Sequence, residues 1–175
     1  MSKPICTVMV GLPAMGKSTL VEGMYKSDTF IYSTDNILER IADQLGKTYD
    51  DVFEKHIKSA TEEAGINLAY AIKEHRDIIW DQTNLGVKKR KNIINRMKKA
   101  GYQVRCDCIV PFEDDYDDNK EVWAERLASR PGKTIPENVL YNMMDSYVRP
   151  TIEEGFDMIT FYNMHGALLA IDYGE

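Results

Sequence analysis

The sequence predicts an α/β fold with a mostly parallel sheet and helices on both faces. Short apolar runs without a helical period alternate with segments of helical spacing, a pattern typical of parallel sheets with crossover helices. The first run, Ile5 to Val10, is apolar at nearly every position, as expected for a central strand covered on both faces. A glycine-rich turn then separates this run from a helical segment. Ligands of such folds bind at the carboxyl ends of the strands.

The size and composition of the chain predict one globular domain over residues 1–175. A chain of 175 residues closes a single substantial core but is short for two. Hydrophobic residues make up 43% and charged residues 29%, which excludes disordered and fibrous classes. The formal net charge of −6 argues against a surface that binds polyanions throughout, because such binding needs clustered lysine and arginine. A local basic cleft remains compatible with this charge.

The cysteines and the N-terminal segment predict a reducing, cytoplasmic setting without a membrane partner. Cys6, Cys106 and Cys108 are odd in number and lack the spacing of a zinc site, so neither a disulfide framework nor a zinc site is expected. The apolar run before the first glycine is too short for a secretory or membrane-spanning segment.

Each further element follows from local spacing and from its boundary residues. Helical segments carry apolar residues every three or four positions; they are expected at 17–26, from Asp35 through Ile41, at 51–75, 87–100, 123–130 and 136–148. Strands are expected at 5–10, 30–32, 77–81, 102–110, 158–162 and 167–171. Glycine at position 101 is expected to end the helix that precedes it. That helix carries a run of basic residues, namely Lys88, Lys89, Arg90, Lys91, Arg96, Lys98 and Lys99. A solvated helix face explains the run better than a basic cleft, although the cleft stays open as an alternative.

The segment Gly11 to Ser18 reads GLPAMGKS and matches the phosphate-loop template G-x-x-x-x-G-K-[ST] at every fixed position. Glycines let the backbone turn tightly, and its amides with the positive helix end attract phosphate oxygens. Lys17 adds a full charge, and the Ser18 hydroxyl is suited to bind Mg²⁺. The sequence therefore predicts binding of ATP with Mg²⁺. The residues expected to bind the nucleotide are Gly11, Pro13, Ala14, Met15, Gly16, Lys17, Ser18 and Thr19.

Two carboxylates follow predicted strands and are candidates for the acceptor side. Asp35 comes after the strand at 30–32, where it would accept the proton of an acceptor hydroxyl; its alternative role is a helix N-cap. Asp81 ends the strand at 77–81, where it would orient a metal-bound water or a substrate group, or simply form a turn.

Two arginines border a predicted lid at about 126–136. Arg126 and Arg130 lie four residues apart in a predicted helix and are expected to share one face. Arginine binds phosphate oxygens in a fork and stabilises charge that develops during transfer. An ordinary surface pair is the alternative.

These residues together resemble the 5′-hydroxyl polynucleotide kinase family, in particular the kinase domain of its bacteriophage member. The resemblance covers about residues 4 to 150. It rests on the phosphate loop GLPAMGKST, on YSTDN around Asp35, on DQTNL from Asp81, and on RLASRPGKTIPENVL with its two arginines. One position departs from the family, which carries an arginine three residues after the aspartate, where this chain has Leu38.

The resemblance implies a role for each motif residue. It makes Lys17, Asp35 and Arg130 catalytic, with Asp35 as the general base, and Lys17 and Ser18 hold ATP and Mg²⁺. The resemblance also implies that Arg126 and Arg130 bind the phosphates of ATP. The acceptor would be bound by Asp35, Arg40, Asp81, Thr83 and Asn84.

The predicted function is an ATP-dependent kinase whose acceptor is a polynucleotide hydroxyl, first of all the 5′-hydroxyl end of DNA or RNA. A hydroxyl on a modified base is an alternative acceptor. A second alternative is a small molecule such as a nucleoside or nucleotide sugar, which Leu38 and the negative net charge favour. A third alternative, an ATP-binding module without turnover, does not account for the acceptor-side aspartate. His56, His75 and His165 are expected to be packing or surface residues.

Overall fold

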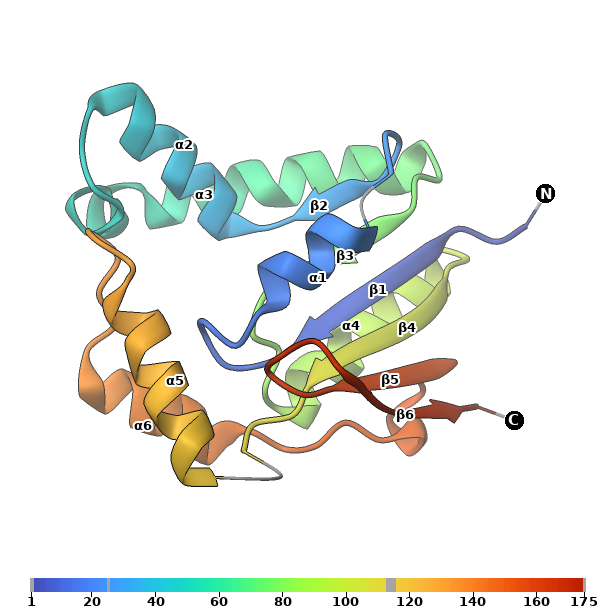
Figure 1. Ribbon diagram of the computed structural model, residues 1–175. Helices are drawn as coiled ribbons and strands as arrows, with labels where there is room; N and C mark the ends of the chain where they lie inside the picture. The colour runs from blue at the N-terminus through green and yellow to red at the C-terminus, as the bar shows by residue number, and fades with distance from the viewer. Residues whose placement is uncertain (1, 25, 113–115, 175) are drawn as a thin grey trace.

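The computed structural model describes residues 2–24, 26–112 and 116–174, and it contains a six-stranded sheet with the order β2-β3-β1-β4-β5-β6. The strands are β1 (Ile5–Val10), β2 (Phe30–Tyr32), β3 (Ile78–Trp80), β4 (Gln103–Ile109), β5 (Met158–Tyr162) and β6 (Leu168–Tyr173). The strands β2, β3, β1, β4 and β5 run parallel, and β6 pairs antiparallel to β5. This arrangement confirms the predicted mostly parallel sheet (Figure 1). The chain changes direction across the sheet at β1, so the carboxyl end of β1 lies at a topological switch point.

Six α-helices connect or follow these strands in the described residues. They are α1 (Lys17–Met24), α2 (Thr34–Leu45), α3 (Tyr49–Lys73), α4 (Val87–Lys99), α5 (Tyr116–Ala128) and α6 (Glu137–Ser146), and a 3₁₀ turn, η1 (Ile152–Glu154), precedes β5. Helix α1 ends at Met24, before the predicted end at residue 26, and residue 25 lies outside the described residues. Helix α3 starts two residues earlier than predicted because Thr48 and Asp51 form a capping box.

The main core lies between the sheet and helices α3 and α4, which cover one face (Figure 1). Side chains of α3 and α4, such as Leu68 and Met97, pack there on inward residues of the strands. Helix α1 covers the other face, where Val21 packs on Met9 of β1 and Ile79 of β3. Helices therefore lie on both faces of the sheet, as predicted.

A separate cluster joins helices α5 and α6 to the phosphate loop. Trp123 of α5 packs with Leu12 and Met15 of the loop, and its indole Nε1 donates a 2.7 Å hydrogen bond to the carbonyl of Pro13. Met143 of α6 packs against the same cluster. Helices α5 and α6 thus pack against the phosphate loop.

The basic helix α4 differs from the predicted solvated face at Arg90. The Arg90 side chain is fully buried and forms a fork with Glu154 of η1, with both N–O distances at 2.7 Å. Its Nη1 also donates to the carbonyls of Asn84 and Leu85 at 3.1 and 2.7 Å. Arg90 therefore connects α4 with η1 and with the segment after β3. It belongs neither to a solvated helix face nor to a basic cleft.

Cys6, Cys106 and Cys108 are buried on the α3–α4 side of the sheet and form no disulfide among the described residues, and burial raises the pKa of Cys6 to about 12. Among the described helices, none combines the length and the apolar character needed to cross a bilayer.

Candidate active site

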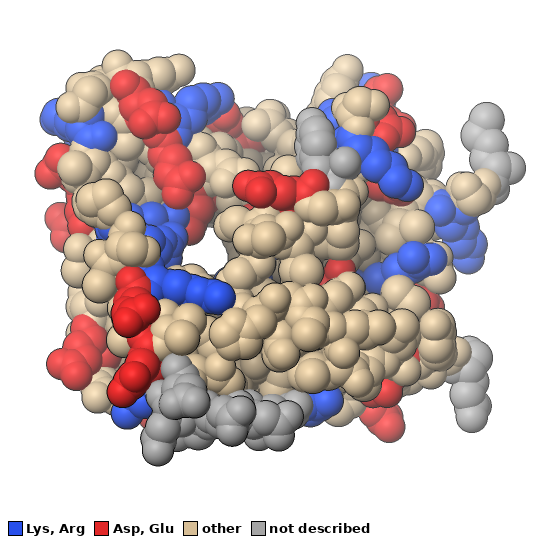
Figure 2. Space-filling view, viewed as in Figure 1, with Lys and Arg blue, Asp and Glu red and all other residues tan. Residues whose placement is uncertain are grey.

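A cavity of about 1230 Å³ lies at the carboxyl ends of the central strands. Figure 2 shows an opening between the lid and the sheet, with basic side chains at its rim. Its walls come from the phosphate loop, the start of α2, the first turns of α3, the segment after β3, the lid and the β5–β6 loop. Parts of the chain that are far apart in sequence therefore meet at the predicted ligand-binding edge of the sheet.

The phosphate loop has the backbone form that anion binding requires. Ala14 and Gly16 have φ angles of 59° and 106°, and left-handed residues in such a turn direct successive amides toward one centre. The amide of Gly11 donates to the carbonyl of Thr83 at 3.1 Å, which ties the loop to the segment after β3. The loop thus presents a concave group of donors that fits phosphate oxygens.

Lys17 folds back over this loop. Its Nζ donates to the carbonyls of Gly11 and Leu12, both at 2.9 Å. Burial lowers the pKa of Lys17 to about 8, and the carboxylates of Asp81 and Asp35 partly oppose that effect. A bound phosphate would offer the buried ammonium a full negative charge in place of two carbonyl dipoles.

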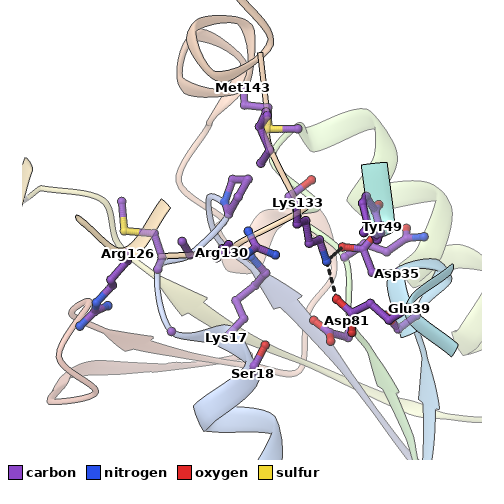
Figure 3. Close-up of a pocket in the computed structure, with 18 of the residues that line it drawn as sticks. Lys17, Ser18, Asp35, Glu39, Tyr49, Asp81, Arg126, Arg130, Lys133 and Met143 are labelled. Atoms are coloured by element: carbon purple, nitrogen blue, oxygen red, sulfur yellow. Dashed lines mark hydrogen bonds and ion pairs between the residues drawn. The ribbon is translucent and has the colours of Figure 1, made fainter. Parts of the chain in front are cut away.

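Asp35 lies in the first turn of α2 and faces the same cavity. Ser33 is the N-cap, since its side chain accepts from the amide of Asn36 at 3.2 Å, so Asp35 is not the cap. One carboxylate oxygen of Asp35 accepts a 2.8 Å hydrogen bond from the hydroxyl of Tyr49, and the other lies 3.0 Å from Nζ of Lys133. Figure 3 shows Lys17 and Asp35 on opposite sides of one space.

The segment after β3 contributes three of its residues to the cavity wall, namely Asp81, Gln82 and Thr83. Burial raises the pKa of Asp81, and the nearby Lys17 ammonium counteracts the rise. The charges of Asp81 and Lys17 therefore influence each other's pKa across the cavity wall.

Asn84 and Arg40, which were predicted to bind the acceptor, are not among the residues that line the cavity. Asn84 is fully buried, and its Nδ2 donates to the carbonyl of Met9 at 2.7 Å, which joins the ends of β1 and β3. Arg40 lies outside the cavity wall and binds both carboxylate oxygens of Glu63 at 2.8 Å. The helical phase of α2 also buries Leu38 completely, so a side chain at this position faces the core.

The two lid arginines separate because α5 ends at Ala128. Arg130 lies beyond that end, so the predicted shared helix face is wrong. Arg126 donates from Nη1 to the carbonyl of Met164 in the β5–β6 loop at 2.8 Å. Arg130 instead lies near Lys17, while Arg126 points away from it (Figure 3). Both arginines line the cavity.

The loop at residues 132–134 is hydrogen-bonded to Asp50 at the start of α3. The carboxylate of Asp50 accepts from the amide of Thr134 at 3.0 and 2.9 Å, and the amide of Asp50 donates to the carbonyl of Gly132 at 2.9 Å. Lys133 between them contacts Asp35 and Glu39. Sequence reasoning missed these residues, because no local spacing links the lid to α2 and α3.

The β5–β6 loop supplies another wall that was not predicted. Met164 and His165 line the cavity, and the ring of His165 lies 3.0 Å from the Asn119 side chain on α5. His165 was expected to be a packing or surface residue, and its exposed side chain fits the surface alternative. Together with Arg126, the loop borders the phosphate-loop end of the cavity.

The donor set fits a nucleoside triphosphate with Mg²⁺. Ser18 presents its hydroxyl beside Lys17, and Asp81 lines the same space (Figure 3). Mg²⁺ prefers oxygen ligands and usually keeps several waters while binding substrate phosphates. The described residues contain no cluster of three or more histidine, cysteine or carboxylate ligands, and a metal shared between Ser18 and phosphate oxygens needs none.

Comparisons with known proteins relate this site to a family. A model of the AAA domain matches residues 7–150. In sequence, the chain is 28% identical over 149 residues to a bifunctional polynucleotide phosphatase/kinase of Schizosaccharomyces pombe. That alignment covers 85% of this chain and 31% of the fungal protein, so the chain spans about a third of its relative's length.

Solved structures share the fold. One, from work on the PezAT toxin–antitoxin system of Streptococcus pneumoniae, has a TM-score of 0.62 at 16% identity and covers 97% of this chain and 72% of that chain. A candidate kinase from Chloroflexus aurantiacus has a TM-score of 0.60 at 16% identity and covers 93% and 89%. The fold is accordingly that of P-loop kinases. Because the family model spans most of the sequence, the chain belongs to the AAA domain family.

Proposed function

We propose that the chain is an ATP-dependent kinase that phosphorylates the 5′-hydroxyl end of DNA or RNA. The observation that carries the proposal is the placement of Lys17 with the phosphate loop on one side of the cavity and of Asp35 on the other. A module that only binds ATP has no use for a carboxylate opposite its phosphate loop. A phosphotransferase with a hydroxyl acceptor needs both.

The donor side would hold the triphosphate through the loop amides, Lys17 and Arg130. Lys17 would release the carbonyls of Gly11 and Leu12 and bind phosphate oxygens. Arg130, from the lid, would stabilise the charge that develops on the transferred group. Ser18 would hold Mg²⁺, which when bound would supply positive charge that neutralises the phosphates. Asp81 would orient the waters around that metal.

The acceptor side would supply the base. As the acceptor oxygen bonds to the terminal phosphorus, the bond from that phosphorus to the bridging oxygen breaks and ADP leaves. The hydroxyl proton passes to a carboxylate oxygen of Asp35. The hydrogen bond from Tyr49 to the other oxygen, at 2.8 Å, fixes the orientation of the carboxylate toward the acceptor.

The choice of a polynucleotide as acceptor is supported by the fungal relative, which is named as a polynucleotide phosphatase/kinase, and by the DQTNL and lid motifs of this chain. A small-molecule acceptor or a hydroxyl on a modified base remains the second candidate. The burial of Leu38 favours it, because α2 then offers no cation at this position for a polynucleotide phosphate.

A labelling panel separates these functions. The protein is incubated with Mg²⁺ and γ-labelled ATP, and with 5′-hydroxyl DNA, 5′-hydroxyl RNA, 5′-blocked hydroxymethylated DNA, or nucleosides and nucleotide sugars. We expect label on the 5′-hydroxyl oligonucleotides and none on the same oligonucleotides carrying a 5′-phosphate. Label only on a nucleoside, a sugar or the modified base would replace the proposed acceptor. Binding of ATP without transfer to any acceptor would contradict the kinase assignment.

A further inference from the structure

The last strand of the sheet, β6, is more exposed than the other strands that the structure describes. All six of its residues are exposed, whereas β1 to β5 contain no exposed residue. Four of the six carry large apolar side chains, and Leu168 and Tyr173 are 58% and 68% exposed. Because these side chains are contiguous along one strand and not scattered over the surface, they mark a contact surface.

β6 also offers one row of backbone groups to a further strand. It is the outermost strand of the sheet, and within the described residues it pairs with β5 alone (Figure 1). The amide of Gly174 donates to the carbonyl of Asp157 in the segment before β5 at 3.0 Å. The alternation of an antiparallel ladder then directs the backbone groups of Ala170 and Asp172 toward β5 and those of Ile171 and Tyr173 outward.

This edge of the sheet lacks the usual protection against strand pairing. Natural edge strands are commonly protected by lysine, by proline, by a bulge or by a covering helix. β6 contains neither lysine nor proline, and its bulge lies at the Leu168 end, which leaves Ala170 to Tyr173 regular. Helix α1 packs on β1 and β3 and lies away from β6 (Figure 1). The edge is therefore open to another strand.

The distribution of charge favours a second copy of this chain as the source of that strand. The formal net charge is −6, so two copies repel each other unless they meet through surfaces that are poor in charge. The surface over β4, β5 and β6 is mostly uncharged (Figure 2), and Asp172 is the only charged residue of β6. A strand that pairs antiparallel with its own copy also forms a closed two-fold dimer.

We propose that two copies of the chain associate through β6 as a two-fold dimer, with Ile171 opposite its own copy, so that the two sheets become one continuous sheet. This register places Leu169 opposite Tyr173 of the other copy, and aromatic and aliphatic side chains in such positions stabilise a sheet. It places Asp172 opposite Ala170 of the other copy, so the two carboxylates do not face each other. The outward backbone groups of Ile171 and Tyr173 gain hydrogen-bond partners.

The dimer keeps the two cavities separate. A two-fold axis between antiparallel strands is perpendicular to the sheet, so the carboxyl ends of the parallel strands point in opposite directions in the two copies. Each cavity lies at those carboxyl ends and is lined by residues of one chain. ATP affinity per subunit should therefore be equal in monomer and dimer. The dimer should be reversible, because one pair of strands buries less surface than a standard interface.

Sedimentation velocity at increasing protein concentration tests for the dimer. We expect wild type to shift reversibly from monomer to dimer. In Ile171→Lys, the dimer Kd should rise by about 100-fold or more, because two copies of an apolar side chain leave the interface and two ammonium groups meet there. Ile66→Lys changes an exposed isoleucine of α3 and should leave the dimer Kd unchanged. Both variants should bind ATP with the Kd of wild type, which shows that they are folded.

Disulfide trapping tests the register. The native cysteines are buried, so a new cysteine on β6 reports on this edge. In a hydrogen-bonded antiparallel pair the Cα atoms lie about 5.5 Å apart, which a disulfide can span. With a mild oxidant, Ile171→Cys should therefore form a covalent dimer with itself. Leu169→Cys and Tyr173→Cys should not do so separately, because like positions lie about 13 Å apart, but a mixture of the two variants should cross-link.

Three results would overturn the inference. A wild type that stays monomeric at the highest concentration would leave β6 available to a strand of a different protein and refute the dimer. A dimer with the same Kd in Ile171→Lys as in wild type would place the interface on another surface. Self-cross-linking of Leu169→Cys or Tyr173→Cys, with none in Ile171→Cys, would contradict the register.

Discussion

The buried ion pair between Arg90 and Glu154 allows a quantitative test of how the acceptor side is held in place. In Arg90→Met, the Glu154 carboxylate keeps its buried position, with a side chain only 4% exposed, but loses both 2.7 Å hydrogen bonds. Removing one partner of such a pair costs about 3–5 kcal/mol of unfolding free energy. The carbonyls of Asn84 and Leu85 also lose a donor, so we expect the upper part of that range.

Urea unfolding measures this loss directly. For a protein of this size, a change of 3–5 kcal/mol lowers Tm by roughly 6–20 °C. Lys91→Met is the matched control, because Lys91 is exposed on the same helix, and surface changes stay within about 0.5 kcal/mol. Arg90→Met/Glu154→Leu removes the unpaired charge and should regain part of the loss. A loss below about 1 kcal/mol in Arg90→Met would refute this account of the pair.

Three further expectations follow from buried titratable groups. Burial lowers the pKa of Lys17 to about 8, so ATP affinity, measured by calorimetry, should weaken as pH rises above about 8, and Lys17→Met should remove that dependence. Burial raises the pKa of Asp107 to about 6, so the free energy of unfolding of the wild type should fall as the pH rises from about 4 to 6. Urea unfolding should therefore show that Asp107→Asn is more stable than the wild type at pH 7, and that the difference is smaller at pH 4. Mass spectrometry after iodoacetamide treatment should find Cys6, Cys106 and Cys108 unlabelled in the native protein and labelled in denaturant, since all are buried.

Much of the fold could be predicted because its signals are local. Strand β1 and helix α1 follow from an apolar run, a glycine-rich turn and helical spacing, and the phosphate loop between them follows from its motif. The strand order could not be predicted in the same way, because pairing such as that of β4 with β5 depends on contacts between distant segments. The antiparallel direction of β6 also depends on the turn that follows β5.

Two errors came from signals that were present in the sequence. Arg90 shares the spacing of Ile93, Ile94 and Met97, and the structure buries all four on the same face of α4. The neighbouring basic residues made this helical spacing of buried positions hard to recognise in the sequence. Arg130 precedes a proline, and a residue before proline disfavours the α conformation. The end of α5 before Arg130 was therefore open to prediction.

The acceptor side was only partly open to prediction. Asp35 and Asp81 were found because strand ends meet at one edge of a parallel sheet, and both line the cavity. Lys133 was missed, since it reaches Asp35 across 98 residues of sequence. The roles of Arg40 and Asn84 depended on side-chain direction, which the helical phase of α2 and the left-handed backbone of Asn84, with φ of 48°, decide.

The most direct test of the account is single-turnover transfer from γ-labelled ATP to a 5′-hydroxyl oligonucleotide in Asp35→Asn. Asparagine keeps the size of the side chain but is not a base at neutral pH. If Asp35 takes the acceptor proton, the transfer rate should fall by about 10²–10⁴-fold, while the Kd for ATP, measured by calorimetry, stays within a few-fold of wild type. A transfer rate equal to that of wild type would contradict the claim that the phosphate loop and Asp35 act together across this cavity.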